Sequence, residues 1–205
     1  ERMKARRLRW LVFATVATVC AIWIAGCQSQ QQKTEQQEQP TAVSAASQQE
    51  MIERGKYLVT VAACGECHTP HKMGPNGPVP DETRLLSGHP QDEKVTPPSG
   101  TPQSWTIMAW RTNTAFFGPW GVAFAANLTP DEETGIGIWD EELFIKVMRT
   151  GKHWGAGRDI ARIMPWHQYA KMTDEDLKAI LAYLKSLPPI KNEVPELIPP
   201  GGKQQ

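Results

Sequence analysis

Residues 64–68 read Cys-Gly-Glu-Cys-His, the C-x-x-C-H pattern of covalent haem attachment. At this spacing each thiol can form a thioether bond to one porphyrin, and the adjacent His68 can bind the iron. A C-x-x-C pair also occurs in zinc sites and in thioredoxin-like redox pairs. A zinc site needs a second ligand pair, but no cysteine follows Cys67, and the redox pair has no use for the histidine. The pattern therefore predicts one haem c, attached through Cys64 and Cys67.

The iron also needs an axial ligand opposite His68, for which methionine and histidine are the usual residues. Met164 is the expected ligand, because the following proline fixes a turn that can present the preceding side chain. The alternative role for Met164 is to fill a gap in the core. His89 and His167 are its main rivals as the ligand. The remaining candidates are Met73, Met108, Met148, Met172, His71 and His153.

Other side chains are candidates for holding the porphyrin or a partner. Indole, guanidinium and amide groups can hydrogen-bond haem propionates, and Trp105, Arg111 and Asn127 are the residues we expect there. A group of basic residues surrounds the stretch before Met164, where it either steers an acidic partner or forms an ordinary solvated face. Its members are Arg149, Lys152, Arg158 and Arg162.

Residues 1–27 are expected to anchor the chain in a membrane or to act as a signal segment. Basic residues at 4–9 precede an uncharged apolar run from Trp10 to Ala25, which places the N-terminus in the cytoplasm and the remainder across the membrane. We expect a retained transmembrane helix, since roughly 17–25 residues span a bilayer. The alternative is a lipoprotein signal with Cys27 lipidated. Either way, the haem domain is expected on the extracytoplasmic (periplasmic) side, tethered to the membrane.

Composition divides the rest of the chain into three parts. Residues 28–47 are rich in glutamine and poor in large apolar side chains, which predicts a flexible linker. Residues 48–190 form the predicted domain, and 191–205 a C-terminal tail. The formal net charge is zero and no basic patch suggests nucleic acid, so nucleic acid is not an expected partner.

The domain is predicted to be all-α. Ser47 and Glu50 form a capping-box pattern that predicts a helix over 48–63. A second helix is expected over 140–149, and a third is expected between Thr173 and Pro188. No convincing strand alternation appears. The long Pro-, Gly- and Trp-rich segment 69–138 is expected to wrap around the domain with a few turns.

The order of these features resembles the class I cytochrome c family. It consists of a helix with Gly55 and Tyr57, the C-x-x-C-H motif, a Met-Pro pair at Met164, and a last helix with Tyr183. In that family the first and last helices cross closely, with the small glycine and the aromatic residues at the crossing. The segments Phe124–Pro130 and Met164–Trp166 are also similar to bacterial membrane-anchored cytochrome c subunits of redox complexes. The spacing from His68 to Met164 exceeds that of the smallest members, so 69–138 is an insertion.

The resemblance implies an electron carrier and not an enzyme. A membrane-tethered haem with His68 and Met164 as axial ligands would exchange single electrons with a membrane redox complex. The expected partners are a photosynthetic reaction centre, a quinol-oxidising complex or a terminal oxidase. One alternative is a permanent structural relay subunit of such a complex. Another is a haem sensor or enzyme with an open iron, which requires that Met164 does not bind.

Overall fold

The computed structural model describes residues 40–97 and 107–202. The predicted membrane segment 1–27, most of the predicted linker, and Trp105 lie outside these residues. The chain divides into two compact units between Ser47 and Gln48, and the site described below belongs to the second unit. Among the described residues, no helix combines the length and the apolar character needed to cross a membrane.

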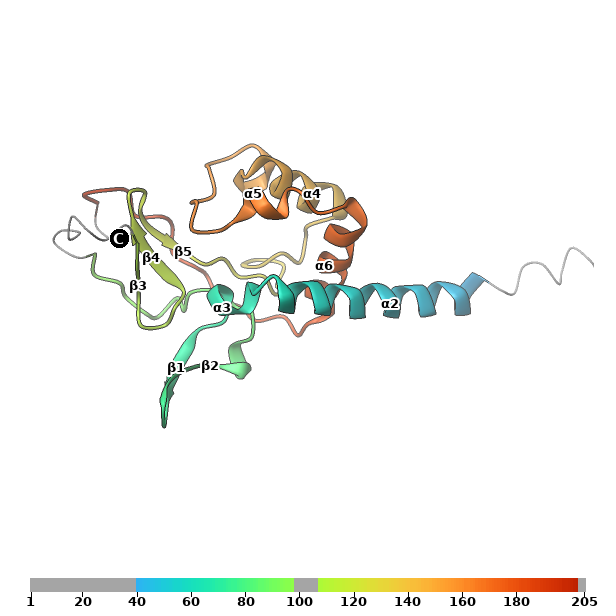
Figure 1. Ribbon diagram of the computed structural model, residues 1–205, viewed down its shortest axis with the longest axis horizontal. Helices are drawn as coiled ribbons and strands as arrows, with labels where there is room; N and C mark the ends of the chain where they lie inside the picture. The colour runs from blue at the N-terminus through green and yellow to red at the C-terminus, as the bar shows by residue number, and fades with distance from the viewer. Residues whose placement is uncertain (1–39, 98–106, 203–205) are drawn as a thin grey trace, which may run out of the picture. The chain divides into compact units, whose positions relative to one another are not determined.

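Five α-helices lie within the described residues (Figure 1). They are α2 (Pro40–Val61), α3 (Cys64–His68), α4 (Glu141–Thr150), α5 (Trp166–Tyr169) and α6 (Asp174–Ser186). α4 packs against both α5 and α6. The helices enclose an apolar core that includes Leu58, Phe144, Val147, Leu177, Ile180 and Leu184.

The ends of α4 and α6 follow from side chains next to them in the sequence. The Asp140 carboxylate accepts a hydrogen bond from the Leu143 amide at 2.8 Å, which caps the start of α4. Gly151 ends that helix in the left-handed conformation, with φ at 64°. The Thr173 hydroxyl accepts from the Asp176 amide at 3.1 Å at the start of α6. These two helices were predicted correctly to within a residue or two.

The first helix crosses the last one closely at Gly55. A Cβ atom built on Gly55 would overlap the carbonyl oxygen of Ala179 and lie 2.8 Å from Cβ of Tyr183. Only a glycine permits this approach, as the family resemblance implied. Tyr57 differs from expectation because its side chain is 57% exposed and lies next to the Arg54 guanidinium. α2 also begins at Pro40, earlier than the predicted start at 48, so Ser47 lies inside the helix.

The all-α prediction is wrong, because two antiparallel sheets lie within the segment 69–138. The first pairs β1 (His71–Gly74) with β2 (Gly77–Pro80). The second has the order β3 (Met108–Ala109), β4 (Ala115–Gly118) and β5 (Gly121–Phe124). β4 and β5 are four residues long and mostly buried along their whole length, so no apolar–polar alternation marks them in the sequence.

The hairpin β1–β2 did carry a sequence signal that the helical interpretation overlooked. Gly74 pairs with Gly77, leaving Pro75 and Asn76 as a two-residue loop. Pro75 and Gly77 occupy the second and fourth positions of this turn, where β-turns favour proline and glycine, so the run Pro-Asn-Gly predicts a turn here.

The last part of the chain packs into the domain. We call residues 190–198 the C-terminal strap. Val122 on β5 and Ile198 in the strap exchange backbone hydrogen bonds of 2.8 and 3.0 Å, and the side chains of Asn192 and Ile198 are buried. The segment 191–205 was predicted to be a tail beyond the domain, but in the structure the strap packs into the domain. The sequence did not indicate this because the pairing partners of the strap lie far away along the chain.

Candidate haem site

The helix α3 presents the three residues of the attachment motif. It is a single turn that follows Ala63, whose backbone is left-handed with φ at 56°. In a helix, residues three and four apart share a face, so Cys64, Cys67 and His68 all point to one side. Cys67 and His68 line a cavity of about 380 Å³.

The His68 ring is oriented by one backbone carbonyl. Its Nδ1 lies 2.8 Å from the carbonyl oxygen of Ala126, which only accepts, so Nδ1 carries the proton. Nε2 is therefore left with its lone pair free for a metal. Burial lowers the pKa of His68 below its ordinary value, and this keeps the imidazole neutral, the form that binds metals. Ala126 thus fixes both the tautomer and the direction of the ring.

The thiols of the motif are kept protonated in the polypeptide. Burial raises the pKa of Cys64 to about 11 and also raises that of Cys67. Zinc binding and thiol–disulfide exchange both use the thiolate, which a low pKa favours. Burial of these cysteines therefore disfavours the thiolate form that both alternatives to haem attachment use.

Met164 lies on the same cavity as His68, although most of the domain separates them in the sequence. Its backbone amide donates to the carbonyl of Ala161 at 3.0 Å in a turn, and Pro165 is the N-cap residue of α5. This is the non-helical turn that the sequence predicted. Ligation by Met164 stays a prediction, but the structure brings together the residues that it requires.

The main rivals of Met164 are less available. Both ring nitrogens of the buried His89 are engaged, with the Thr114 hydroxyl at 2.9 Å and the Glu93 carbonyl at 3.0 Å. His167 lies exposed on α5 and does not line the cavity. Two of the other candidates, Met148 and His153, do line it. Met148 also packs on the apolar core, in agreement with its position in α4.

The remaining predicted site residues have other roles or lie outside the description. The Arg111 side chain forms an ion pair with Glu93 at 2.8 Å, is 74% exposed, and does not line the cavity. Asn127 lines the cavity, but its amide is occupied: Nδ2 donates to the Ile190 carbonyl at 2.8 Å, and Oδ1 accepts from the backbone and the hydroxyl of Thr129. Asn127 therefore stabilises the wall of the cavity. Trp105 is not among the described residues.

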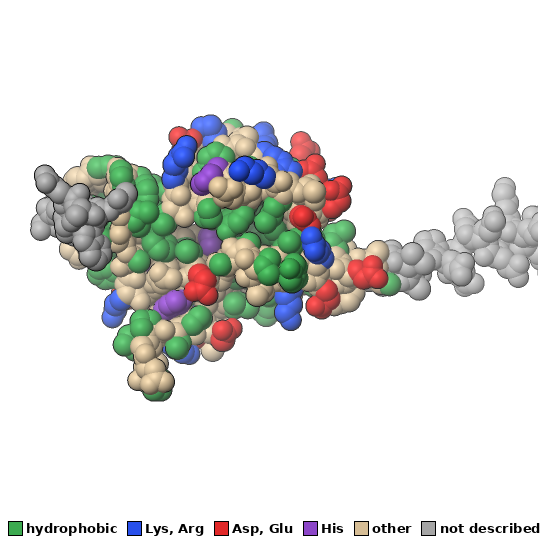
Figure 2. All heavy atoms as spheres, in the orientation of Figure 1, with side chains coloured by type: hydrophobic (Ala, Val, Ile, Leu, Met, Phe, Trp, Pro, Cys, Tyr) green, Lys and Arg blue, Asp and Glu red, His purple; other side chains and the backbone are tan. Residues whose placement is uncertain are grey.

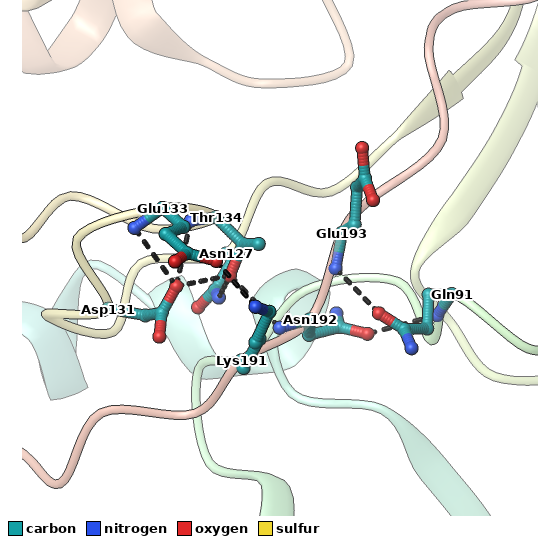
Figure 3. Close-up of polar contacts among 8 residues, drawn as sticks. All are labelled: Gln91, Asn127, Asp131, Glu133, Thr134, Lys191, Asn192 and Glu193. Atoms are coloured by element: carbon teal, nitrogen blue, oxygen red, sulfur yellow. Dashed lines mark hydrogen bonds and ion pairs between the residues drawn. The ribbon is translucent and has the colours of Figure 1, made fainter.

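The sequence analysis missed the contribution of the C-terminal strap. Residues 193–197 form one wall of the cavity. Figure 3 shows the polar contacts that hold the strap, in which Asn192 is central. Its side chain accepts from the amide of Gln91 at 2.9 Å and donates to the carbonyls of Ser87 and His89 at 2.7 and 2.8 Å. Nothing local in the sequence identifies these partners.

The cavity fits a haem. Its walls are largely apolar and aromatic, which suits a flat apolar macrocycle. Cys67 and the buried, neutral His68 with its free Nε2 line the cavity, and Met164 supplies a thioether sulfur from another segment. The apolar walls include Phe116, Phe124, Trp139, Phe144, Val147, Trp154, Ile160 and Ile163.

Comparisons with known proteins agree with this geometry. The chain is 38% identical over 145 residues to a nicotinate dehydrogenase subunit of Pseudomonas putida, covering 71% of this chain and 9% of that protein. It is 28% identical over 171 residues to the fructose dehydrogenase cytochrome subunit of Gluconobacter japonicus, covering 83% of this chain and 27% of the relative. A dihaem c-type cytochrome of Cereibacter sphaeroides is 31% identical over 142 residues, which cover 68% of this chain and 36% of the relative.

These relatives are much longer than the region they share with this chain, so the matches concern one domain. Residues 52–188 match the family model for cytochrome c. That range includes the attachment motif, Met164 and both crossing helices, and it confirms the resemblance derived from the sequence. The chain therefore belongs to the cytochrome c family, whose domain carries covalently bound haem c.

Proposed function

We propose that this domain carries one electron at a time to or from a larger redox complex, through a single haem c with His68 and Met164 as axial ligands. As a cytochrome c, it is an electron-transfer protein and not an enzyme. The observation that carries the proposal is the cavity lined by both His68 and Met164. When bound, haem supplies an iron centre that gains or loses a single electron.

The residues of the chain define how such a centre would behave. Cys64 and Cys67 would hold the porphyrin covalently, while Ala126 keeps His68 directed towards the iron. Met164 would fill the opposite axial position and leave none for a substrate. A methionine ligand also raises the reduction potential relative to a second histidine. The apolar walls exclude water, which further favours the less charged, reduced form.

We further propose that the partner is a dehydrogenase complex associated with a membrane, with the haem domain on the extracytoplasmic side. Two of the relatives described above are named as subunits of dehydrogenases, and this supports the choice of partner. The basic flank at 4–9 supports the location. The reaction centre, quinol-oxidising complex and terminal oxidase expected earlier stay predictions. The single C-x-x-C-H motif supports one haem, although one relative is a dihaem protein.

The test is a redox-titrated absorption spectrum of the haem-loaded protein and of two variants. In Met164→Ala we expect loss of the methionine-to-iron charge-transfer band and a markedly lower midpoint potential. Met148→Ala is the matched control, because this methionine lines the same cavity from α4. It should keep the band.

Three results would contradict the proposal. A band that survives in Met164→Ala would assign the ligand to another methionine. Absence of the band in the unmodified protein would indicate histidine ligation or an open site, and rapid carbon monoxide binding would identify the open site. A polypeptide mass with no added porphyrin would exclude haem attachment altogether.

A further inference from the structure

A short loop beside the cavity holds a tryptophan in an unfavourable backbone conformation. Trp154 lies in the loop 151–160 and has φ at 55°, in the left-handed region that a bulky residue rarely adopts. Strain of this kind persists only where the surrounding structure imposes it, and it is concentrated at functional positions. The loop is closed at its base by hydrogen bonds from the Ile160 amide to the Gly151 carbonyl at 2.8 Å and from the His153 amide to the Arg158 carbonyl at 2.9 Å.

This strained residue connects the cavity wall with the surface. The Trp154 side chain lines the cavity, yet 48% of the residue is exposed. Its ring centroid lies 5.6 Å from that of the buried Trp139, which also lines the cavity. Trp154 is therefore a rigid aromatic group that leads from the haem cavity to solvent. Tryptophan is among the residue types enriched at the energetic hot spots of protein interfaces.

The surroundings of Trp154 carry an excess of positive charge. Segment 146–163 contains five basic residues and only one acidic residue, Asp159, although the whole chain has a formal net charge of zero. Cationic side chains gather over α4 and the loop after it (Figure 2). The five are Lys146, Arg149, Lys152, Arg158 and Arg162.

The ion pairs of this region leave part of the positive charge in excess. Lys152 pairs with Asp159 at 2.6 Å, Arg158 lies 3.5 Å from Glu196 of the strap, and Arg149 pairs with Asp174 at 2.5 Å. Solvent reaches all three pairs, so water screens them. Among the described residues, Arg162 has no acidic partner.

We propose that the loop 151–160, together with the adjacent Arg162, is the docking surface for an electron-exchanging protein whose own surface is acidic with an apolar centre. Trp154 would be the apolar anchor, and Lys152, Arg158 and Arg162 would select and steer the acidic rim of the partner. One electron passes between the partner's cofactor and the haem, so one of the two is oxidised and the other reduced. This inference rests on the proposed function and specifies where its partner binds.

The test uses reduced flavodoxin, a small acidic flavin protein, as the probe donor and a neutral benzohydroquinone as a donor that needs no docking surface. Stopped-flow reduction of the oxidised, haem-loaded protein gives the second-order rate constant for each donor. Lys152→Gln and Arg162→Gln should lower the flavodoxin rate severalfold and flatten its dependence on salt, while leaving the hydroquinone rate and the midpoint potential unchanged. Lys72→Gln is the matched control, since Lys72 also pairs with an aspartate, Asp81 at 2.9 Å.

Trp154 is tested by the ratio of the two rates. Trp154→Ala should lower the ratio of the flavodoxin rate to the hydroquinone rate by at least about tenfold. Trp154→Phe should restore most of it, because an aromatic ring remains. An unchanged ratio in Trp154→Ala together with unchanged salt dependence in the charge variants would overturn the docking surface.

A failure of the proposed function gives a different result. In that case the unmodified protein would lack the His/Met spectrum, or neither donor would reduce it. If Trp154→Ala altered the spectrum and the potential but not the rate ratio, Trp154 would be a haem-packing residue and the docking proposal would be wrong.

Discussion

The two sides of the haem cavity are stabilised by different forces. The helical region, formed by α2, α4 and α6, buries an almost purely apolar cluster. The region opposite consists of the segments 87–97 and 107–129 and the C-terminal strap, and it buries many polar side chains. These include His89, Thr114, Asn127, Thr129 and Asn192, each 3% exposed or less.

This difference determines how each side can fail. Apolar contacts are non-directional, so the helical side depends on volume and close approach. A buried polar group depends on particular partners, and removing one partner leaves the other unsatisfied at a cost of about 1–3 kcal/mol. The helical side should therefore respond most to added volume, and the strap side to lost hydrogen bonds.

The largest effect is expected at the helix crossing. Gly55→Val places side-chain atoms where the Ala179 carbonyl already lies, and we expect the free energy of unfolding to fall by more than about 3 kcal/mol. Denaturant unfolding of the haem-loaded protein measures it. Gly65→Ala is the control, because its new Cβ would meet nothing closer than Thr69 Oγ1 at 3.6 Å. If both variants had similar stability, the close approach of α2 and α6 would be disproved.

The strap side is tested at Asn192. Asn192→Ala removes the partner of the Gln91 amide and of the Ser87 and His89 carbonyls, and we expect a loss of about 2–4 kcal/mol in the free energy of unfolding. Asn192→Asp has nearly the same volume but directs a carboxylate at two carbonyls, so it should destabilise at least as much. A mild effect of the aspartate would mean that volume, and not hydrogen bonding, holds the strap. Gln49→Ala is the control, because Gln49 is an exposed amide that donates to Glu53, and it should change the free energy of unfolding little.

The polar side should also be sensitive to acid. Burial lowers the pKa of His89 below its ordinary value of 6.5, so the unfolded chain binds a proton more readily than the folded one. Stability is then fully present above about pH 6.5 and decreases as the pH falls, by up to about 1.4 kcal/mol per pH unit for one histidine.

Denaturant unfolding at several pH values measures this dependence. His89→Gln should reduce the slope between about pH 6.5 and 5. A slope that His89→Gln does not alter would assign the acid sensitivity to other groups.

The smallest effect is expected for ion pairs on the helical surface. Arg54 pairs with Asp176 at 2.9 Å between α2 and α6, with side chains 53% and 24% exposed. Because solvent screens this pair, Arg54→Gln should cost no more than about 1 kcal/mol. Lys178→Gln, which breaks the exposed pair with Glu141, should behave alike. If either variant lowered the free energy of unfolding as much as Asn192→Ala does, the expected difference between the helical side and the strap side would be disproved.

Sequence reasoning succeeded where the determining residues are neighbours. Asp140 and Gly151 mark the ends of α4, and Thr173 marks the start of α6, because helix caps are satisfied within a few residues. It failed for β4 and β5, whose short buried strands lack alternation, and for the strap. The buried Asn192 shows why, since its partners Ser87, His89 and Gln91 are about one hundred residues away.

The sequence by itself determined the chemistry of this protein. The spacing of Cys64, Cys67 and His68 predicts the attached haem because one helical turn brings these side chains together without help from the rest of the chain. Only the tertiary structure decided which distant groups complete the site. It placed Met164 and the strap at the cavity, gave Ala126 the role of orienting His68, and assigned Asn127 and Arg111 to other contacts. Those outcomes depend on contacts between segments far apart in sequence, which no local pattern encodes.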